Sequence, residues 1–345
     1  MKAALFTAPG QITITDVPKP DAGPGEVLIK VQACAVCGTD VKIFGHGHPK
    51  LKPPRVLGHE LAGTIAEIGN GVAGYEVGDR VCIVTVVGCR QCDLCRQEKF
   101  NICPDLKAVG YDFDGGFAEY ILMDSTAVDQ GNILKIPPEL SFEEATLVEP
   151  LSCVINGQSY LNIVPGDTVI VIGAGPIGSL HCELAKLRGA TKILLADVAS
   201  SRLEIAQRMN IDILVDSSKE DLVERVMKET GGCGADVVIT ACGVGQAQEN
   251  AIEMAAKQAR ISLFGGLPKD KPNIKFNSNL VHYREISVHG VFASNSFQYI
   301  QAIHLLAAKR VQACRFITHR FDLDDVIKGI EAARSGETLK VIIKP

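Results

Sequence analysis

The stretch TVIVIGAGPIGSLHCELAKLRGATKILLAD, residues Thr168–Asp197, decides the fold of this chain. The β-branched run Thr168–Ile172 enters a glycine-rich turn, a helix-length segment extends to Arg188, and a second apolar run covers Lys192–Ala196. This order predicts a strand, a glycine turn, a helix and a second strand. We therefore expect an α/β domain built on a doubly wound parallel sheet.

The glycine turn has the spacing of a dinucleotide-binding motif. Gly173 permits the tight turn, Gly175 lets the backbone approach a pyrophosphate, and Gly178 lets the helix pack closely on the strand. The helix N-terminus favours the negative charge of the phosphates. We predict that the cofactor is bound by Gly173, Gly175, Pro176, Ile177 and Gly178.

An acidic residue follows the turn at the distance that this motif requires. Asp197 closes the second strand about twenty residues after the first glycine, where a carboxylate accepts hydrogen bonds from both ribose hydroxyls. The same carboxylate would repel a 2′-phosphate. The sequence therefore predicts NAD rather than NADP as the cofactor.

Length and composition limit the number of domains and the kinds of partner that the chain can bind. The chain has 345 residues, of which 46% are hydrophobic, so it can bury more than one core and we expect two domains. The formal net charge is −5 and no long basic block is present. The sequence therefore lacks a basic patch that would bind a nucleic-acid phosphate backbone, and we expect no nucleic-acid partner.

Membrane association and secretion are not expected either. The apolar runs Val81–Val87 and Val169–Ile172 are too short to span a bilayer, and Met1–Gly10 lacks the apolar core of a signal peptide. We expect a cytoplasmic protein. In an intracellular enzyme of this size, the 12 cysteines indicate metal ligands and buried thiols rather than disulfides.

The first third of the chain contains two sets of metal-ligating residues. Residues 1–35 alternate apolar and polar positions, which predicts an antiparallel β start, and Cys37, His59 and Glu60 follow. Cysteine, histidine and carboxylate are the donor types of a catalytic zinc site, which leaves one position open. A lone cysteine or histidine is more often a packed residue, so this trio needs support from its context.

That support comes from four cysteines close together in the sequence. The segment from Gly88 is hydrophilic and has no strand or helix period, so a closed thiolate site would have to hold it together. Two disulfides or four free thiols fit the expected compartment poorly. The structural zinc ligands predicted here are Cys89, Cys92, Cys95 and Cys103.

With these motifs in their order, the chain resembles the zinc-dependent medium-chain dehydrogenases, in the subgroup of sorbitol (polyol) and threonine dehydrogenases. The resemblance covers essentially the whole chain. It implies an α/β chain with a GroES-like, mostly-β catalytic domain and a Rossmann domain that binds NAD. It also implies two zinc ions per chain, one catalytic and one structural, and a homo-oligomer, either a tetramer or a dimer.

The resemblance assigns roles to individual residues. Cys37 and His59 match the catalytic zinc ligands. Glu60 matches the glutamate that binds this zinc directly or alternates with water, and Glu149 matches the further glutamate at the zinc site of the polyol dehydrogenases. Thr39 matches the hydroxyl residue that hydrogen-bonds the reacting alcohol. Asp40 matches the acid behind the zinc-bound histidine, where a carboxylate fixes the imidazole tautomer.

After Asp197 the sequence continues with alternating short apolar runs and helix-length segments, including a helix expected over Gln246–Lys257. The resemblance adds further cofactor-binding residues, namely Arg202, Phe264, Gly265, Gly266, Phe292 and Ala293. We expect a catalytic domain over 1–153 with the zinc lobe at 88–104, a Rossmann domain over 154–290, and a return segment over 291–345 that completes the catalytic domain. The active site is expected between the two domains.

These assignments imply an NAD-dependent zinc alcohol dehydrogenase of class EC 1.1.1 that acts on a small alcohol, most simply a polyol. Two departures from the relatives concern the substrate, which stays open, and the proton relay. Sorbitol dehydrogenases carry an arginine where this chain has Ala293, and Lys42 replaces a histidine that relays the alcohol proton in many relatives. The charged segment Gly45–Lys52 is either a solvated loop or a binding site for a sugar-alcohol phosphate, and threonine also stays open as a substrate.

A non-enzymatic protein that binds its partners through the zinc lobe is the alternative from another class. It predicts many basic or aromatic residues around the cysteines. Next to Asp93 and Glu98 the lobe offers only Arg90, Arg96, Lys99 and Phe100.

Overall fold

The computed structural model describes residues 1–209 and 211–345, and it divides into two compact units. Unit 1 comprises Met1–Ser152 together with Ala293–Pro345, and unit 2 comprises Cys153–Phe292. The sequence placed these boundaries after residues 153 and 290. Helix α5 (Val148–Ser159) contains the first of them.

Unit 2 is built on a six-stranded sheet in which each pair of neighbouring strands is parallel. Its spatial order is β13-β12-β11-β14-β15-β16. The strands are β11 (Thr168–Ile172), β12 (Lys192–Asp197), β13 (Ile213–Asp216), β14 (Ala235–Thr240), β15 (Ala255–Leu263) and β16 (Ser287–Gly290). The helices between them are α6 (Pro176–Arg188), α7 (Ser200–Ala206), α8 (Leu222–Glu229), α9 (Gly245–Glu253) and α10 (Ser278–Arg284).

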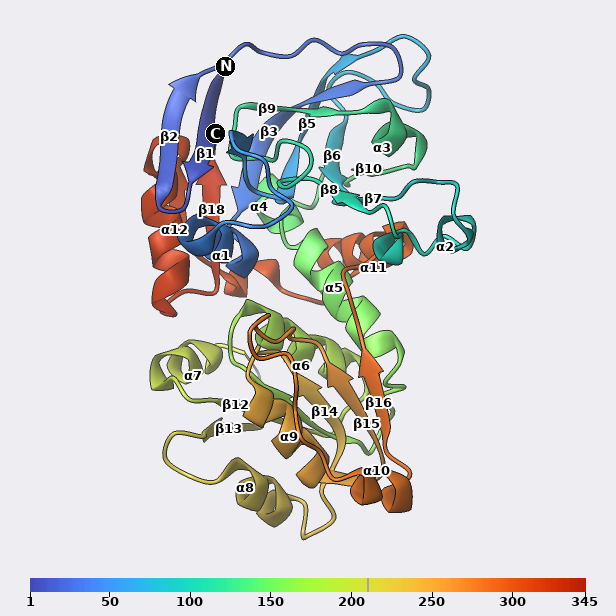
Figure 1. The fold of residues 1–345 in the computed structure, drawn as a ribbon, viewed down its shortest axis with the longest axis vertical. Helices are drawn as coiled ribbons and strands as arrows, with labels where there is room; N and C mark the ends of the chain where they lie inside the picture. The colour runs from blue at the N-terminus through green and yellow to red at the C-terminus, as the bar shows by residue number, and fades with distance from the viewer. Residues whose placement is uncertain (210) are drawn as a thin grey trace. The chain divides into compact units, whose positions relative to one another are not determined.

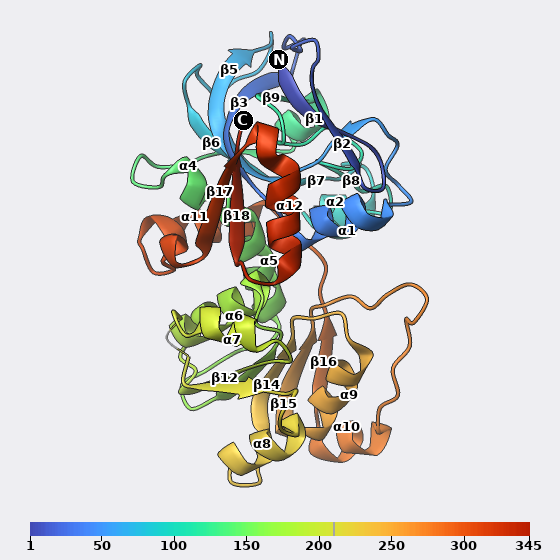
Figure 2. The same ribbon diagram turned by 90° about the vertical axis from the view of Figure 1, so that its left-hand side faces the viewer.

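Both faces of this sheet are covered because successive strand residues point to opposite sides. In β11, Val169 and Val171 pack in one core with residues of α6 and α7, such as Ala185. Ile170 and Ile172 pack in a second core with residues of α8 and α9. Figure 2 shows α9 and α10 beside β15. The predicted doubly wound sheet is confirmed.

One helix is shorter than its sequence predicts. The expected helix over Gln246–Lys257 ends at Glu253 in α9, and β15 begins at Ala255. Alanine and lysine favour helices, but Ala255 pairs with Ala235 of the neighbouring strand. Sheet pairing therefore overrides local propensity at this point.

Unit 1 is mostly β-structure. A sheet of seven strands has the order β10-β6-β5-β3-β18-β17, with β9 also paired to β3, and a smaller sheet has the order β2-β1-β4. The strands are β1 (Lys2–Ala8), β2 (Gln11–Asp16), β3 (Val27–Ala35), β4 (Arg55–Val56), β5 (Glu60–Ile68), β6 (Arg80–Ile83), β7 (Val86–Val87), β8 (Lys107–Ala108), β9 (Tyr120–Met123), β10 (Ile133–Lys135), β17 (Ile317–Asp322) and β18 (Lys340–Lys344).

Short helices surround these sheets. The α-helices are α1 (Gly38–His46), α2 (Asp93–Arg96), α3 (Ser125–Asp129), α4 (Phe142–Ala145), α11 (Ser296–Ala307) and α12 (Val326–Ser335). The 3₁₀ helices are η1 (Phe100–Ile102), η2 (Ala313–Arg315) and η3 (Leu323–Asp325). Among the residues that the structure describes, no helix is both long and apolar enough to cross a membrane.

The C-terminal segment enters the main sheet of unit 1. Strand β18 pairs antiparallel with β3, with Ile343 opposite Cys34, and parallel with β17 (Figure 1). Helix α12 packs on β18 and on α1. Val341 and Ile343 of β18 join the same core as Ile29 and Val31 of β3. The last strand is therefore part of the scaffold that carries the residues just after β3.

Candidate functional site

The first candidate metal centre is assembled by strand pairing in unit 1. Cys37 is the N-cap residue of α1, two residues after β3 ends, and His59 and Glu60 lie where β5 begins. Because Ala35 lies opposite Glu60 in the β3–β5 ladder, the register brings the three side chains together. One ligand atom from each of Cys37, His59 and Glu60 lies within 4.8 Å of the others. Thiolate, imidazole and carboxylate form the donor set of a catalytic zinc site.

Asp40 supports this group from behind. Its Oδ2 accepts a hydrogen bond of 2.8 Å from the Cys37 backbone N–H, its Oδ1 accepts one of 3.3 Å from Gly58, and Oδ1 lies 3.6 Å from Nδ1 of His59. Burial alone would lower the pKa of His59, but Asp40 and Cys37 outweigh it and raise that pKa. With Nδ1 facing Asp40, Nε2 of His59 is the nitrogen available to a metal.

Glu60 has a charged neighbour, Lys340, that the sequence did not indicate. The Lys340 ammonium of β18 contacts both carboxylate oxygens of Glu60, and the two side chains are 3% and 1% exposed. Burial alone would lower the pKa of Lys340, but Glu60 and Cys37, with a smaller contribution from Glu149, outweigh burial and raise it. Glu149 lies in the first turn of α5, within electrostatic range of Lys340. It is outside the group Cys37, His59 and Glu60.

Tyr111 is another residue next to the Cys37, His59 and Glu60 group that the sequence did not indicate. Its ring lies 5.9 Å from the His59 ring and 5.3 Å from the His48 ring, measured between centroids. Burial raises the pKa of Tyr111 to about 12, while His59 and a hydrogen bond from Thr39 act in the opposite direction. Thr39, at the start of α1, therefore faces the same space as Tyr111. Lys42 of the same helix is exposed.

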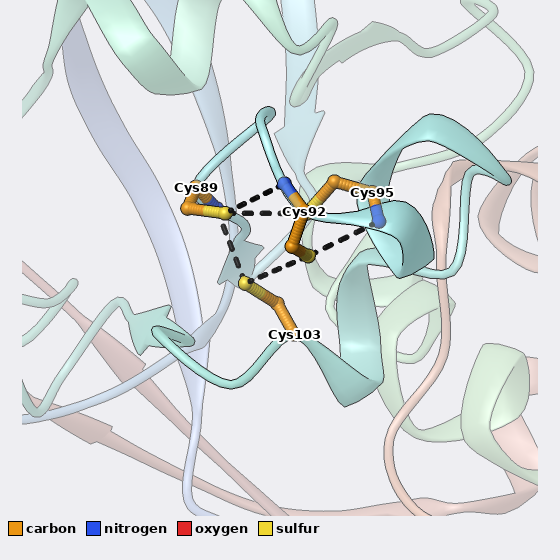
Figure 3. A group of neighbouring side chains, drawn as sticks. All are labelled: Cys89, Cys92, Cys95 and Cys103. Carbon is orange, nitrogen blue, oxygen red and sulfur yellow. Dashed lines mark hydrogen bonds between the residues drawn. The ribbon is translucent and has the colours of Figure 1, made fainter.

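The four-cysteine lobe forms a second and separate centre. Figure 3 shows the sulfur atoms of Cys89, Cys92, Cys95 and Cys103 converging on one point. The Cys89–Cys95 and Cys92–Cys103 sulfur pairs are 4.0 Å and 3.9 Å apart. A tetrahedral zinc with Zn–S bonds of about 2.3 Å needs sulfurs about 3.8 Å apart, so the donors fit a closed zinc site.

Backbone N–H groups of the lobe point at its sulfur atoms. The N–H groups of Cys92 and Cys95 donate to the sulfurs of Cys89 and Cys92, over 3.4 Å in both cases. Backbone hydrogen bonds, first from Gln91 and then from Cys92, lower the pKa of Cys89 to about 7. A Cβ on Gly88 would lie 2.7 Å from Sγ of Cys95, so only glycine fits there.

The glycine turn of unit 2 has the predicted geometry. Gly173 follows directly after β11 and has φ +113°, which favours glycine. A Cβ on Gly178 would lie 1.7 Å from the carbonyl oxygen of Gly173, so helix α6 packs on the turn only with glycine there. A Cβ on Gly175 meets nothing within 4 Å. Gly175 therefore borders open space at the N-terminus of α6, where Pro176 and Ile177 begin the helix and where a pyrophosphate would bind.

Asp197 ends β12 beside this turn. Its Oδ2 accepts a hydrogen bond of 2.7 Å from the Ala174 N–H, and its Oδ1 accepts one of 2.9 Å from Ala199. Arg202 of α7 lies 3.7 Å away and is partly exposed. Each carboxylate oxygen keeps a lone pair for a ribose hydroxyl. Asp197 thus fixes the turn as well as facing the expected ribose position.

The other predicted cofactor residues occupy two places. Gly265 donates to the carbonyl of Thr240, so Phe264, Gly265 and Gly266 follow β15 next to the carboxyl end of β14. The Phe264 ring packs edge-on against His181 at 4.6 Å, which turns it toward the core. Phe292 ends unit 2 and is 60% exposed, and Ala293, with φ +48°, is the first residue of the second segment of unit 1.

Fold and donor sets together define a class of protein, a zinc-dependent oxidoreductase with a nicotinamide dinucleotide. Residues 23–138 match the alcohol dehydrogenase GroES-like domain, and residues 176–308 match the zinc-binding dehydrogenase family. The L-threonine 3-dehydrogenase of Pyrococcus horikoshii is 35% identical over 99% of this chain and 98% of its own. The sorbitol dehydrogenase of Halalkalibacterium halodurans is 33% identical over 100% and 99%.

A solved structure gives the same result. The zinc-binding dehydrogenase of Sinorhizobium meliloti bound to NADP superimposes with a TM-score of 0.93 at 31% identity, over 100% of this chain and 99% of its own. The chain belongs to the zinc-dependent medium-chain alcohol dehydrogenases, in the subgroup of sorbitol and threonine dehydrogenases. It is a zinc- and nicotinamide-dependent alcohol dehydrogenase with a small-molecule alcohol as substrate.

Proposed function

We propose that this enzyme oxidises the secondary hydroxyl of a polyol with NAD. The observation that carries the proposal is the group Cys37, His59 and Glu60, with the hydroxyl-bearing Thr39 and Tyr111 on the same side of unit 1. A substrate with several hydroxyls matches a metal site lined by hydroxyl donors and acceptors. The sorbitol dehydrogenase relative supports this choice.

The residues of unit 1 have distinct roles in this proposal. Cys37 and His59 hold the catalytic zinc, and Asp40 keeps Nε2 of the imidazole directed at the metal. The bound zinc supplies Lewis-acid chemistry that favours the alkoxide over the alcohol. Thr39 orients the reacting hydroxyl through a hydrogen bond. Glu60 and Glu149 contribute negative charge that Lys340 balances.

Unit 2 selects and binds NAD. The turn Gly173–Gly178 and the residues after β15 accept the dinucleotide, and Arg202, Phe292 and Ala293 complete its contacts. Asp197 selects the unphosphorylated ribose, because its carboxylate is buried and fixed by two backbone N–H groups. The relative bound to NADP makes this preference worth measuring directly.

L-Threonine is the second candidate substrate, because relatives with that activity align over almost the whole chain. A sugar-alcohol phosphate is the third, since Lys50 and Lys52 lie exposed in the segment that contains His48. The test is NADH formation with polyols, their phosphate esters, L-threonine and simple alcohols. The highest kcat/KM on a free polyol is expected, and a preference for threonine or a phosphate ester would overturn the polyol assignment.

We further propose a cytoplasmic homo-oligomer, a dimer or a tetramer. Among the described residues, β16 is an edge strand of the unit 2 sheet, and its Val288 is 41% exposed. An exposed edge strand offers backbone groups to a second copy of the chain. Light scattering should report a multiple of the chain mass, and Val288→Lys should lower it. A monomeric wild-type protein would contradict this assembly.

A further inference from the structure

Tyr111 is held in a fixed place beside the candidate metal group. The Ala108 N–H donates to Oδ2 of Asp112 over 2.9 Å, and the Gly110 N–H donates to the carbonyl of Phe113, also over 2.9 Å. Val109 is buried and its N–H donates to Thr85 over 3.0 Å. The loop is therefore tied down on both sides of Tyr111, so the phenol is presented by a rigid support.

The surroundings of Tyr111 place its hydroxyl within the site. Its ring packs against the rings of His59 and His48, and its phenol interacts electrostatically with Cys37 and Asp40. The side chain is only partly buried. The centres of the Tyr111 and His59 rings are 5.9 Å apart. When a substrate reacts beside His59, the carbon next to its reacting carbon would therefore be within reach of the Tyr111 phenol.

The phenol also has a proton to offer. Thr39 acts to lower the pKa of the Tyr111 phenol, which is the effect of a hydrogen bond donated to the phenol oxygen. A phenol hydroxyl has one proton in addition to its acceptor lone pairs, so that proton remains for another oxygen. His48 makes an edge-on contact with the Tyr111 ring at an interplanar angle of 76°, which helps to hold the ring in its orientation.

We propose that Tyr111 is a specificity-determining residue whose hydroxyl donates a hydrogen bond to a second hydroxyl of the substrate, next to the carbon that is oxidised. This inference rests on the proposed function of the site in unit 1. It assigns to Tyr111 the recognition of the diol pattern that separates a polyol from a simple secondary alcohol. A site built to hydrogen-bond a substrate hydroxyl discriminates against the analogue that lacks it.

The test compares 2,3-butanediol with 2-butanol, which differ by one hydroxyl. For each alcohol, KM is measured if it is oxidised, and otherwise its competitive inhibition constant against the alcohol that is turned over. Tyr111→Phe keeps the ring contacts and removes only the hydroxyl. It should weaken binding of the diol about five- to tenfold and that of 2-butanol less than twofold.

Tyr75→Phe is the matched control, because Tyr75 also loses one hydrogen bond, of 2.8 Å to the carbonyl of Ile133. It should leave both alcohols unchanged. Zinc content and the urea unfolding midpoint are measured for each variant. Equal weakening of the diol and the simple alcohol in Tyr111→Phe, or no weakening, would overturn the inference. A wild-type enzyme that does not oxidise polyols would instead contradict the proposed substrate, while the inhibition constants still report on Tyr111.

Discussion

Lys340 forms an ion pair with both carboxylate oxygens of Glu60, 280 positions earlier in the chain, and both side chains are buried. Removing one partner of a buried pair leaves an uncompensated charge, which costs about 3–5 kcal/mol. We expect Lys340→Met to lose about this much free energy of unfolding in urea. The double variant Lys340→Met with Glu60→Gln should recover most of the loss, because no buried charge is left alone.

The control for this prediction is Lys344→Met on the same strand. Lys344 is 46% exposed and pairs with Glu143 over 2.6 Å, so its loss should cost less than about 1 kcal/mol. If Lys340→Met were as mild as Lys344→Met, the ion pair with Glu60 would not stabilise the fold. A double variant as unstable as the single one would lead to the same conclusion.

The four-cysteine lobe should be structural. Cys95→Ser removes one of four converging sulfurs, so the zinc content should fall from about two ions per chain to about one, and the free energy of unfolding by about 3 kcal/mol or more. Cys233→Ser changes an exposed thiol and serves as the control. A Cys95→Ser protein with unchanged stability and full zinc content, but without turnover, would show that the lobe acts in the reaction.

Asp197 should set the choice of cofactor. Asp197→Ser removes the carboxylate that we expect to face the ribose, so the ratio of kcat/KM with NAD to that with NADP should fall at least about tenfold. Asp216→Ser is the control, because Asp216 lies opposite Asp197 at the end of the neighbouring strand. An unchanged ratio in Asp197→Ser would remove Asp197 from cofactor recognition.

His181 should make unit 2 sensitive to acid. Burial lowers its pKa to about 3, from an ordinary value of about 6.5. Because the folded pKa is depressed, the unfolded chain binds the proton more readily below pH 6.5, and stability falls as the pH drops toward 3. When the pH falls from 7.5 to 5.5, this histidine should lower the free energy of unfolding by about 1.4 kcal/mol.

The measurement is urea unfolding of wild type, His181→Leu and His304→Gln at both pH values. His181→Leu should lose about 1.4 kcal/mol less than wild type on acidification. His304 is exposed on α11, and its variant should follow wild type. Identical acid sensitivity in all three proteins would refute the role of His181.

Much of the fold and site could be predicted because the deciding signals are local. The glycines after β11 report close backbone approaches, since a Cβ on Gly178 would collide with the carbonyl of Gly173. The nearly unbroken apolar run Thr168–Ile172 marks a strand with both faces covered. The spacing of the four lobe cysteines is short enough for the sequence alone to indicate one metal site. Each signal lies within about thirty residues.

Only the tertiary structure decided which distant side chains share the site. Lys340 reaches Glu60 because β18 pairs with β3 and β3 pairs with β5, and no sequence pattern encodes that register. Tyr111 reaches His59 and His48 because the loop after β8 is tied to its own backbone beside them. The sequence determines the local backbone geometry and the donor types. The contacts between segments far apart in the chain depend on sheet register and loop packing, which form only when the whole unit folds.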